Sequence, residues 1–384
     1  MNRRSLLKST FLGVSGLSVF PSLVFSRSQS RIQAQRLRHA LIPLADEIEP
    51  EFLKTGKPQV KVRLLANENP YGPSPKAKKA IIDAIDASFM YPGQSMKALI
   101  EEIAKVERVD PKQVMLGAGS SQLLLATFLA YGPKGKFVVA DPGYISRVEE
   151  LDLDKVPLTS DYKHDLKAMA DRVSDKTSLV YICNPNNPTG TEVDAATLRD
   201  FCASVSAKVP VMVDEAYIDY VKNPQESSMI DCIRKGQNVI VLRTFSKLHA
   251  FAGLRIGYCI AQPKIIEEIE KFHSVNSLAH TSLEAARASY QDAEFAKMVL
   301  SKTQEAKDFV YKTLQDHGFS YIPSCTNFVL FPLRMKGDTF IDKMSDEGVQ
   351  VRRWEFNQQH WCRVSLGKME DMKIFAEAFS KVVS

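Results

Sequence analysis

The stretch Ser178-Leu-Val-Tyr-Ile-Cys-Asn-Pro-Asn-Asn-Pro-Thr-Gly190 is an apolar run that ends abruptly in a polar turn made rigid by proline and glycine. The same change occurs twice more, where residues 209–213 lead into Asp214-Glu-Ala-Tyr217 and residues 238–242 lead into Arg243-Thr-Phe-Ser-Lys247. Continuous apolar runs of this kind are typical of parallel strands that are covered on both faces. Because the carboxyl ends of such strands meet at one edge of the sheet, we expect the three polar clusters to converge on one crevice.

On either side of these three runs, strand-like and helix-like segments alternate along the chain. This alternation predicts an α/β fold in which helices sandwich a mostly parallel sheet. We expect strands at residues 136–140, 178–183, 209–213 and 238–242, and helices at residues 121–131, 194–206 and 225–235.

The pattern changes to a long helical stretch at residues 265–316, which strand-like runs and a helix from Glu370 follow. This order predicts a smaller α+β domain at the C-terminus, with strands at residues 327–331, 349–351 and 362–365. The predicted organisation is a leader at 1–35, an N-terminal arm and part of the small domain at 36–65, a large domain at 66–275 and the small C-terminal domain at 276–384.

The composition excludes several classes of protein. The chain has 384 residues and is 45% hydrophobic and 25% charged, values that are ordinary for a globular protein and exclude a disordered, collagen-like or coiled-coil chain. Its net charge of +5 comes from residues 1–45, which hold seven basic residues and no acidic residue. The body from Asp46 onward has 43 basic and 45 acidic residues, so we expect no nucleic-acid partner.

The N-terminus predicts an export signal. Asn2-Arg-Arg-Ser-Leu-Leu-Lys8 precedes an apolar stretch at residues 11–25 that is too short and too weakly apolar for a stable membrane span. The paired arginines resemble the twin-arginine signal of exported bacterial proteins, which places the mature protein in the periplasm. Ser26 and Ala34 are the candidate cleavage positions, and neither has a complete small-x-small pattern. An uncleaved, leader-anchored or cytoplasmic protein is the alternative.

The six cysteines are widely spaced and form no Cys-x-x-Cys pair or other zinc or redox motif, so we expect no metal site. Buried free thiols are the simplest interpretation of such cysteines. In an oxidising compartment one pair would be able to form a disulfide, and the spacing does not select which pair.

Lys247 stands at the end of a strand, where a lysine is suited to form an imine with an aldehyde cofactor. Arg255, eight residues later, can neutralise a phosphate group. Thr244 and Ser246 add hydroxyl donors, and Gly253 allows a close approach of the backbone. Alone, such a lysine is more often a solvated surface charge; its surroundings favour the cofactor site.

Asp214 emerges from an apolar strand, where a carboxylate is costly unless it has a partner. Beside a pyridine nitrogen it would keep that nitrogen protonated, and Tyr217 would donate to the cofactor's phenolic oxygen. The alternative is an ordinary helix N-cap with Glu215 in the first turn. Asn187 is expected to point its amide into the crevice, with a tight surface loop as the alternative.

Gly117-Ala-Gly-Ser-Ser121 opens an apolar helix. The free amides of a helix N-terminus bind phosphate, and a plain helix start is the alternative. Tyr144, shortly after a strand, is suited to stack on a flat ring and equally suited to the core.

Taken together, these segments resemble the pyridoxal-phosphate enzymes of the aspartate aminotransferase fold (fold type I, aminotransferase class I/II), and among them the histidinol-phosphate aminotransferase-like group. The resemblance spans about residues 60–370, with the segments in the family's order. The matching segments are Asn67-Glu-Asn-Pro-Tyr-Gly72, Tyr91-Pro-Gly93, residues 184–190, 214–217 and 244–247 with Arg255, and Arg363-Val-Ser-Leu-Gly367.

This resemblance implies pyridoxal 5'-phosphate as the cofactor and a role for each matching residue. Lys247 would hold the cofactor covalently and move the proton, and Asp214 would pair with the ring nitrogen. Tyr71 would reach the phosphate in a neighbouring subunit, which makes the active unit a homodimer. The other implied contacts are Gly119, Ser120, Ser121, Thr244, Ser246 and Arg255 at the phosphate, Tyr144 at the ring, Asn187 and Tyr217 at the phenolic oxygen, and Arg363, Arg352 and Asn187 at the substrate.

The implied reaction is transfer of an amino group from an amino acid or related anionic amine to a 2-oxo acid. An exported enzyme would not meet the phosphorylated intermediate of histidine synthesis, so we expect a role outside that pathway. A decarboxylase or lyase on the same scaffold is the first alternative, and a non-catalytic binding protein is the second. The phosphate loop also departs from many relatives, which have Asp and Glu where this chain has Ser121 and Gln122.

Overall fold

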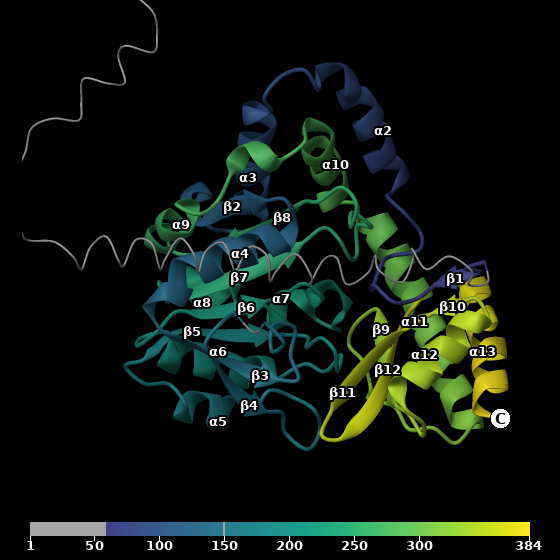
Figure 1. The fold of residues 1–384 in the computed structure, drawn as a ribbon. Helices are drawn as coiled ribbons and strands as arrows, with labels where there is room; N and C mark the ends of the chain where they lie inside the picture. The colour runs from purple at the N-terminus through teal and green to yellow at the C-terminus, as the bar shows by residue number, and fades with distance from the viewer. Residues whose placement is uncertain (1–58, 149) are drawn as a thin grey trace, which may run out of the picture.

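The computed structural model describes residues 59–148 and 150–384, so the predicted leader and most of the predicted arm lie outside the described residues. A seven-stranded sheet in the order β2-β8-β7-β6-β5-β3-β4 forms the centre of the larger part (Figure 1). Within this sheet β8 runs antiparallel to both neighbours, so the predicted α/β fold with a mostly parallel sheet is confirmed. The strands are β2 (Val114–Gly117), β3 (Lys136–Asp141), β4 (Leu153–Pro157), β5 (Thr177–Cys183), β6 (Val211–Asp214), β7 (Val239–Thr244) and β8 (Gly257–Ile260).

The four strands predicted for this sheet are β3, β5, β6 and β7. The sequence analysis missed β2, β4 and β8. The edge strand β4 has one buried side chain, that of Val156, and therefore lacks the apolar run of a covered strand. β2 and β8 are buried, but each has a glycine among its four residues, so neither shows the unbroken apolar run that leads into β6.

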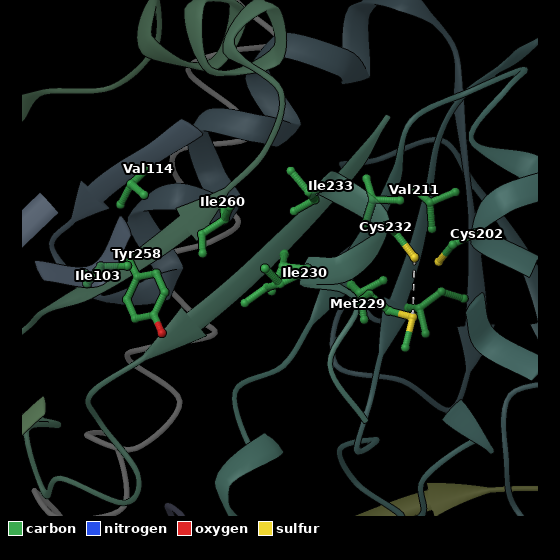
Figure 2. Packing of buried hydrophobic residues seen from close by; sticks show 14 of the residues in the cluster. Ile103, Val114, Cys202, Val211, Met229, Ile230, Cys232, Ile233, Tyr258 and Ile260 are labelled. Atoms are coloured by element: carbon green, nitrogen blue, oxygen red, sulfur yellow. Dashed lines mark hydrogen bonds between the residues drawn. The ribbon is translucent and has the colours of Figure 1, made fainter. Parts of the chain in front are cut away.

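Helices cover both faces of the sheet because its strands are apolar on both sides. Val211 and Val213 of β6 face one apolar cluster, and Met212 between them faces the other. Figure 2 shows part of the first cluster, where Cys202 and Cys232 lie close to Met229 and to Val211 of β6. α4 (Gly119–Tyr131) and α9 (Pro263–Glu270) contribute to the second cluster, and α2 (Pro75–Ala84), α3 (Gly93–Glu107), α5 (Leu166–Asp171), α6 (Ala195–Val205), α8 (Ile230–Arg234) and α10 (His280–Tyr290) to the first.

Two predicted helical stretches are divided in the structure. Residues 225–235 form α7 (Pro224–Ser227) and α8, because Ser228 is extended and its hydroxyl donates to the buried Glu215. Residues 265–316 form α9, α10 and α11 (Ala293–Asp316). Between α9 and α10 the Ser277 hydroxyl donates to the carbonyl of Ser274 at 2.7 Å, which is the kind of local bond that competes with a helix.

The C-terminal part is a second, smaller layer of strands and helices. β11 (Arg352–Phe356), β12 (Gln359–Ser365) and β9 (Phe328–Pro332) form an antiparallel sheet, on which α11, α12 (Gly337–Asp346) and α13 (Met369–Val383) pack (Figure 1). β1 (Val62–Arg63) pairs with β10 (Val349–Gln350). The sequence analysis missed β11, in which charged side chains alternate with Trp354. The predicted domain boundaries stay predictions.

All six cysteines lie among the described residues and are unbridged; five are buried, and Cys325 is half-buried. Within residues 59–148 and 150–384, the helices are too short or too polar to cross a membrane.

Candidate active site

A pocket of about 480 Å³ opens at the carboxyl ends of β5, β6 and β7, where the sequence predicted a crevice. Side chains from β11 and β12 of the smaller sheet line it as well. All of the predicted site residues except Gly119 and Tyr71 line this pocket. The predicted residues that line it are Ser120, Ser121, Tyr144, Asn187, Asp214, Tyr217, Thr244, Ser246, Lys247, Arg255, Arg352 and Arg363.

Lys247 follows the end of β7, and the backbone oxygen of Asn67 holds its amine. The Nζ atom donates to that oxygen at 3.2 Å and lies 5.5 Å from the centre of the Tyr217 ring. Burial lowers the pKa of Lys247 to about 8, and the positive charge of Arg363 acts in the same direction. An amine with this pKa is partly unprotonated near neutral pH, as a nucleophile or base must be.

Asp214 ends β6 and is 3% exposed. Its Oδ2 accepts from the hydroxyl of Tyr181 at 2.8 Å, and its Oδ1 accepts from the amide of Ala216 at 3.1 Å. Burial raises the pKa of Asp214 to about 6, and these two hydrogen bonds oppose that shift. A buried carboxylate at a pocket wall favours a cationic N–H group as its ligand. The helix-cap alternative for Asp214 is wrong: the short helical turn that follows begins at Ile218 with Tyr217 as its N-cap, so the bond from the Ala216 amide to Asp214 lies in the turn before it.

The sequence analysis missed Tyr181, which orients Asp214 from the neighbouring strand β5. Within an apolar strand a tyrosine gives no signal of a polar role. Glu215 takes no part in the pocket: it is 1% exposed and forms a salt bridge with Arg243 at 3.0 Å on the far side of β7.

Asn67 connects several elements of the site and was also missed, although it lies in a motif that the sequence analysis singled out. Its φ of 54° is left-handed, a conformation that asparagine tolerates better than most residues. Its backbone oxygen accepts from Lys247 and from Asn327, the latter at 3.0 Å. Its side chain donates to the Tyr217 hydroxyl at 2.9 Å and accepts from Ser365 at 3.1 Å.

The first turn of α4 forms one end of the pocket. The Gln122 side chain accepts from the Ala118 amide at 2.7 Å, and the N-cap residue Ala118 offers no side chain to the amides of the first turn. These amides are therefore suited to bind an anion together with the hydroxyls of Ser120 and Ser121. The guanidinium of Arg255 lies against Gly119, which has a left-handed φ of 72° and leaves no room for a Cβ atom. Gly119 therefore serves the site by allowing this approach rather than by lining the pocket.

Across the pocket, Arg363 is 6% exposed on β12. Its Nη1 donates to Oδ1 of Asn187 at 2.7 Å and its Nη2 to the carbonyl of Leu65 at 2.9 Å, while its buried Nε has no hydrogen-bond partner among the residues that the structure describes. Burial lowers the pKa of Arg363 to about 10, and the neighbouring charge of Arg352 adds to this effect. The amide nitrogen of Asn187 remains as a donor to the pocket.

Of the predicted tyrosines Tyr144 and Tyr71, only Tyr144 lies in the pocket. Tyr144 lines the pocket, and burial raises its pKa to about 12. Tyr71 packs outside the pocket of its own chain, against Leu248, Phe295 and Val299.

The residues present fit pyridoxal phosphate. The α4 terminus, hydroxyls and Arg255 suit its phosphate, buried Asp214 suits its ring nitrogen, and the amine of Lys247 suits its aldehyde. These three groups lie on one pocket wall built from β5–β7 and α4.

Comparison with known proteins agrees with this chemistry. The family model for aminotransferase class I and II matches residues 59–379. The histidinol-phosphate aminotransferase of Brevibacillus brevis is 36% identical over 313 residues, which are 80% of this chain and 85% of that protein. That of Moorella thermoacetica is 34% identical over 334 residues, 84% of this chain and 86% of that protein. The solved histidinol-phosphate aminotransferase of Sinorhizobium meliloti in complex with pyridoxal 5'-phosphate superposes with a TM-score of 0.78 over 97% of this chain and 99% of that chain; at 24% identity it shows the fold.

We expect pyridoxal phosphate to add covalently to Lys247 at a rate that rises as the pH passes through about 8, because the unprotonated amine is the nucleophile. The growth of cofactor absorbance after mixing with apoprotein measures this rate. Lys307→Met is the matched control, because Lys307 also has a pKa lowered by burial but lies outside the pocket. A midpoint near 10.5, the ordinary value for lysine, would contradict the assignment.

Proposed function

The chain belongs to the aminotransferase class I and II family, and from this premise we propose that it is an exported enzyme that transfers amino groups outside histidine synthesis. It is a pyridoxal-phosphate-dependent, histidinol-phosphate aminotransferase-like transaminase that acts on an amino compound and a 2-oxo acid. The observation that supports the proposed chemistry is that Lys247 and Asp214 line one pocket from neighbouring strands.

The lysine amine is the group that moves the proton. Asn67 holds the Nζ atom through its backbone oxygen, and a pKa of about 8 leaves a usable fraction of free amine near neutral pH. In its unprotonated form Nζ is suited to take the proton from the α-carbon of the substrate, and it would return that proton to the carbon of the cofactor's aldehyde group. When bound, pyridoxal phosphate supplies the aldehyde that the amine attacks and a ring that delocalises the charge left at the α-carbon.

The Asp214 carboxylate holds a proton on the ring nitrogen. With a pKa of about 6 it is largely ionised at neutral pH, and Tyr181 and the Ala216 amide fix its two oxygens. A fixed negative charge in a buried site stabilises the protonated form of a nitrogen beside it.

Arg363 is suited to bind the carboxylate or phosphate of the substrate. Its guanidinium is already oriented by Asn187 and Leu65, and these two bonds use only two of its five N–H groups. Because the fork is oriented before a ligand arrives, little conformational entropy is lost on binding.

We expect the cofactor-loaded protein to exchange amino groups between an amino acid and a 2-oxo acid with ping-pong kinetics. Lys247→Ala should slow exchange by roughly 10²-fold or more, because the proton-transfer group is lost, while some cofactor remains bound through its phosphate. Separation of products from a screen of amino donors measures the exchange, with Lys307→Met as the control for loss of a buried lysine. Release of carbon dioxide without exchange would favour a decarboxylase instead, and a protein that takes up no cofactor would favour a binding role.

The proposal of export rests on the paired arginines Arg3 and Arg4 and the apolar stretch that follows them. The twin-arginine route is understood to carry folded proteins, so an enzyme that acquires its cofactor in the cytoplasm would be able to cross with the cofactor bound. An enzyme outside the cytoplasm does not meet the intermediate of histidine synthesis, which is why we propose another amine as its substrate.

Fractionation of the producing bacterium tests export. We expect the mature protein in the periplasmic fraction, and the double variant Arg3→Lys, Arg4→Lys in the cytoplasm with its leader intact. Arg27→Lys makes the same chemical change outside the pair and should leave export unchanged. Wild-type protein that keeps its leader and stays in the cytosolic fraction would contradict the proposal of export.

A homodimer is proposed because Tyr71 lies outside the pocket of its own chain. To contact a cofactor, Tyr71 would have to reach the pocket of a second subunit across an interface. The exposed apolar side chains of Ile82 in α2 and of Phe89 and Tyr91 between α2 and α3 support an interface on this part of the molecule; they are 67%, 85% and 88% exposed.

Mixing two inactive variants tests this arrangement. Lys247→Ala and Tyr71→Ala should each be inactive or nearly so, and unfolding and refolding them together should restore about a quarter of wild-type activity, because half of the dimers are mixed and each has one intact site. A monomeric protein, or a mixture as inactive as its components, would contradict the role of Tyr71 across an interface.

A further inference from the structure

Glu215 follows Asp214 directly in the sequence, and the two carboxylates lie on opposite faces of the large sheet. Successive side chains of a strand point to opposite faces, so the end of β6 directs Asp214 to the cofactor pocket and Glu215 to the face of Val211 and Val213. Both carboxylates are almost completely buried. Two carboxylates this close in a buried region repel each other, so each makes the charged form of the other more costly.

Arg243 on β7 is the cation beside Glu215. Its Nε donates to Oε2 of Glu215 at 3.0 Å, and its Nη2 donates to the Ser228 hydroxyl at 2.9 Å. Its Nη1 donates at 3.0 Å to Oε1 of Glu107, which also accepts from the Tyr290 hydroxyl at 3.0 Å. Arg243, Glu107 and Glu215 line a second pocket of about 550 Å³, and none of the three lines the cofactor pocket.

The surroundings of Glu215 favour its charged form. Burial raises the pKa of Glu215 above its ordinary value, and the charge of Arg243 is the largest effect that opposes this shift. The Met229 amide at 2.7 Å and the Ser228 hydroxyl at 2.9 Å also donate to the carboxylate. The negative charge behind Asp214 is therefore balanced by a guanidinium, which is the condition under which a buried carboxylate is tolerated.

The charge of Glu215 acts on Asp214. Burial raises the pKa of Asp214 to about 6, the charge of Glu215 adds to this shift, and the charge of Lys247 opposes it. Further titratable groups that face Asp214 stay uncharged near neutral pH because burial raises their pKa values; they are Tyr144, Tyr181 and Cys183. The charge state of Asp214 thus depends on how well the charge of Glu215 is balanced.

We propose that Arg243 is a positioning residue for the reaction, which balances the charge of Glu215 on one face of the sheet and thereby keeps Asp214 charged on the other. Arg243 acts through Glu215 and touches no part of the cofactor pocket. This inference rests on the proposed amino-transfer function and adds to it an ion pair that sets the lowest pH at which the site holds its cofactor.

Variants of the two residues change the charge of this ion-pair cluster in steps. Glu107, Arg243 and Glu215 together carry a net charge of −1 in the wild type, 0 in Glu215→Gln and −2 in Arg243→Gln. The double variant Arg243→Gln, Glu215→Gln has a net charge of −1 again, although both side chains have changed. The double variant therefore separates an effect of charge from an effect of shape.

The affinity of the apoprotein for pyridoxal phosphate, measured against pH by cofactor absorbance, reports on Asp214. A charged Asp214 favours the cofactor, so the affinity of the wild type should fall below about pH 6. In Glu215→Gln this fall should move about 0.5 to 1 pH unit lower, because a negative charge is removed while Arg243 remains. In the double variant it should return close to the wild-type position. Titration of the free cofactor is common to all variants and cancels in the comparison.

Thermal unfolding of the apoprotein gives a second readout. Arg243→Gln leaves Glu215 and Glu107 without their cation and should lower Tm by roughly 5 to 15 °C. Adding Glu215→Gln should recover more than half of that loss, because no unbalanced carboxylate then remains beside Asp214. The matched control is Asp231→Asn, which removes a carboxylate from an ion pair with Arg199 at 3.1 Å and lines neither pocket. It should leave the pH of the fall in affinity unchanged.

Two results overturn the inference. One is a fall in affinity at the same pH in Glu215→Gln as in the wild type, and the other is a double variant as unstable as Arg243→Gln. Should Arg243→Gln not fold, Glu215→Gln and the double variant still decide the test. Exchange of amino groups by the wild type without the pH shift in Glu215→Gln overturns this inference alone, whereas a wild type that takes up no cofactor overturns the proposed function as well.

Discussion

The site depends on the burial of two opposite charges, the Asp214 carboxylate and the Lys247 amine, at the ends of the paired strands β6 and β7. Burial moves their pKa values in opposite directions, to about 6 and about 8, because it disfavours the charged form of each group. Hydrogen bonds from Tyr181 and Ala216 compensate the carboxylate in part. A cofactor with a cationic ring nitrogen and an aldehyde relieves both costs at once, since it pairs with the carboxylate and removes the charge of the amine. The same desolvation that makes the groups costly therefore makes them reactive.

Asn67 links this arrangement to both sheets of the molecule. Its hydrogen bonds reach Lys247 and Tyr217 at the large sheet and Asn327 and Ser365 at the small one. The segment before α2 thereby fixes the distance between the amine and the anion-binding wall. A left-handed asparagine is able to do so because its backbone oxygen and its side chain point to different elements.

Charge is distributed unevenly around the pocket. The wall formed by β6, β7 and α4 combines a carboxylate, an amine and an anion cradle, which together match one cofactor. The wall formed by β11 and β12 carries Arg352 and Arg363, and the guanidinium of Arg363 lies 5.3 Å from the centre of the Phe328 ring. The two walls therefore differ in the charges that they present to the pocket.

The sequence by itself determined the α/β class, the four central strands and 12 of the 23 residues that line the pocket. It did so because each apolar run ends directly in the polar residues that it positions, so fold and site are encoded in the same short segments. Only the tertiary structure revealed Tyr181 as the partner of Asp214, Asn67 as the partner of Lys247, and Arg243 as the partner of Glu215. These contacts join residues that are far apart in the sequence, and their geometry follows from how strands and helices pack, which no local pattern records. The position of Tyr71 outside its own pocket was decided in the same way, by packing against α11 and Leu248.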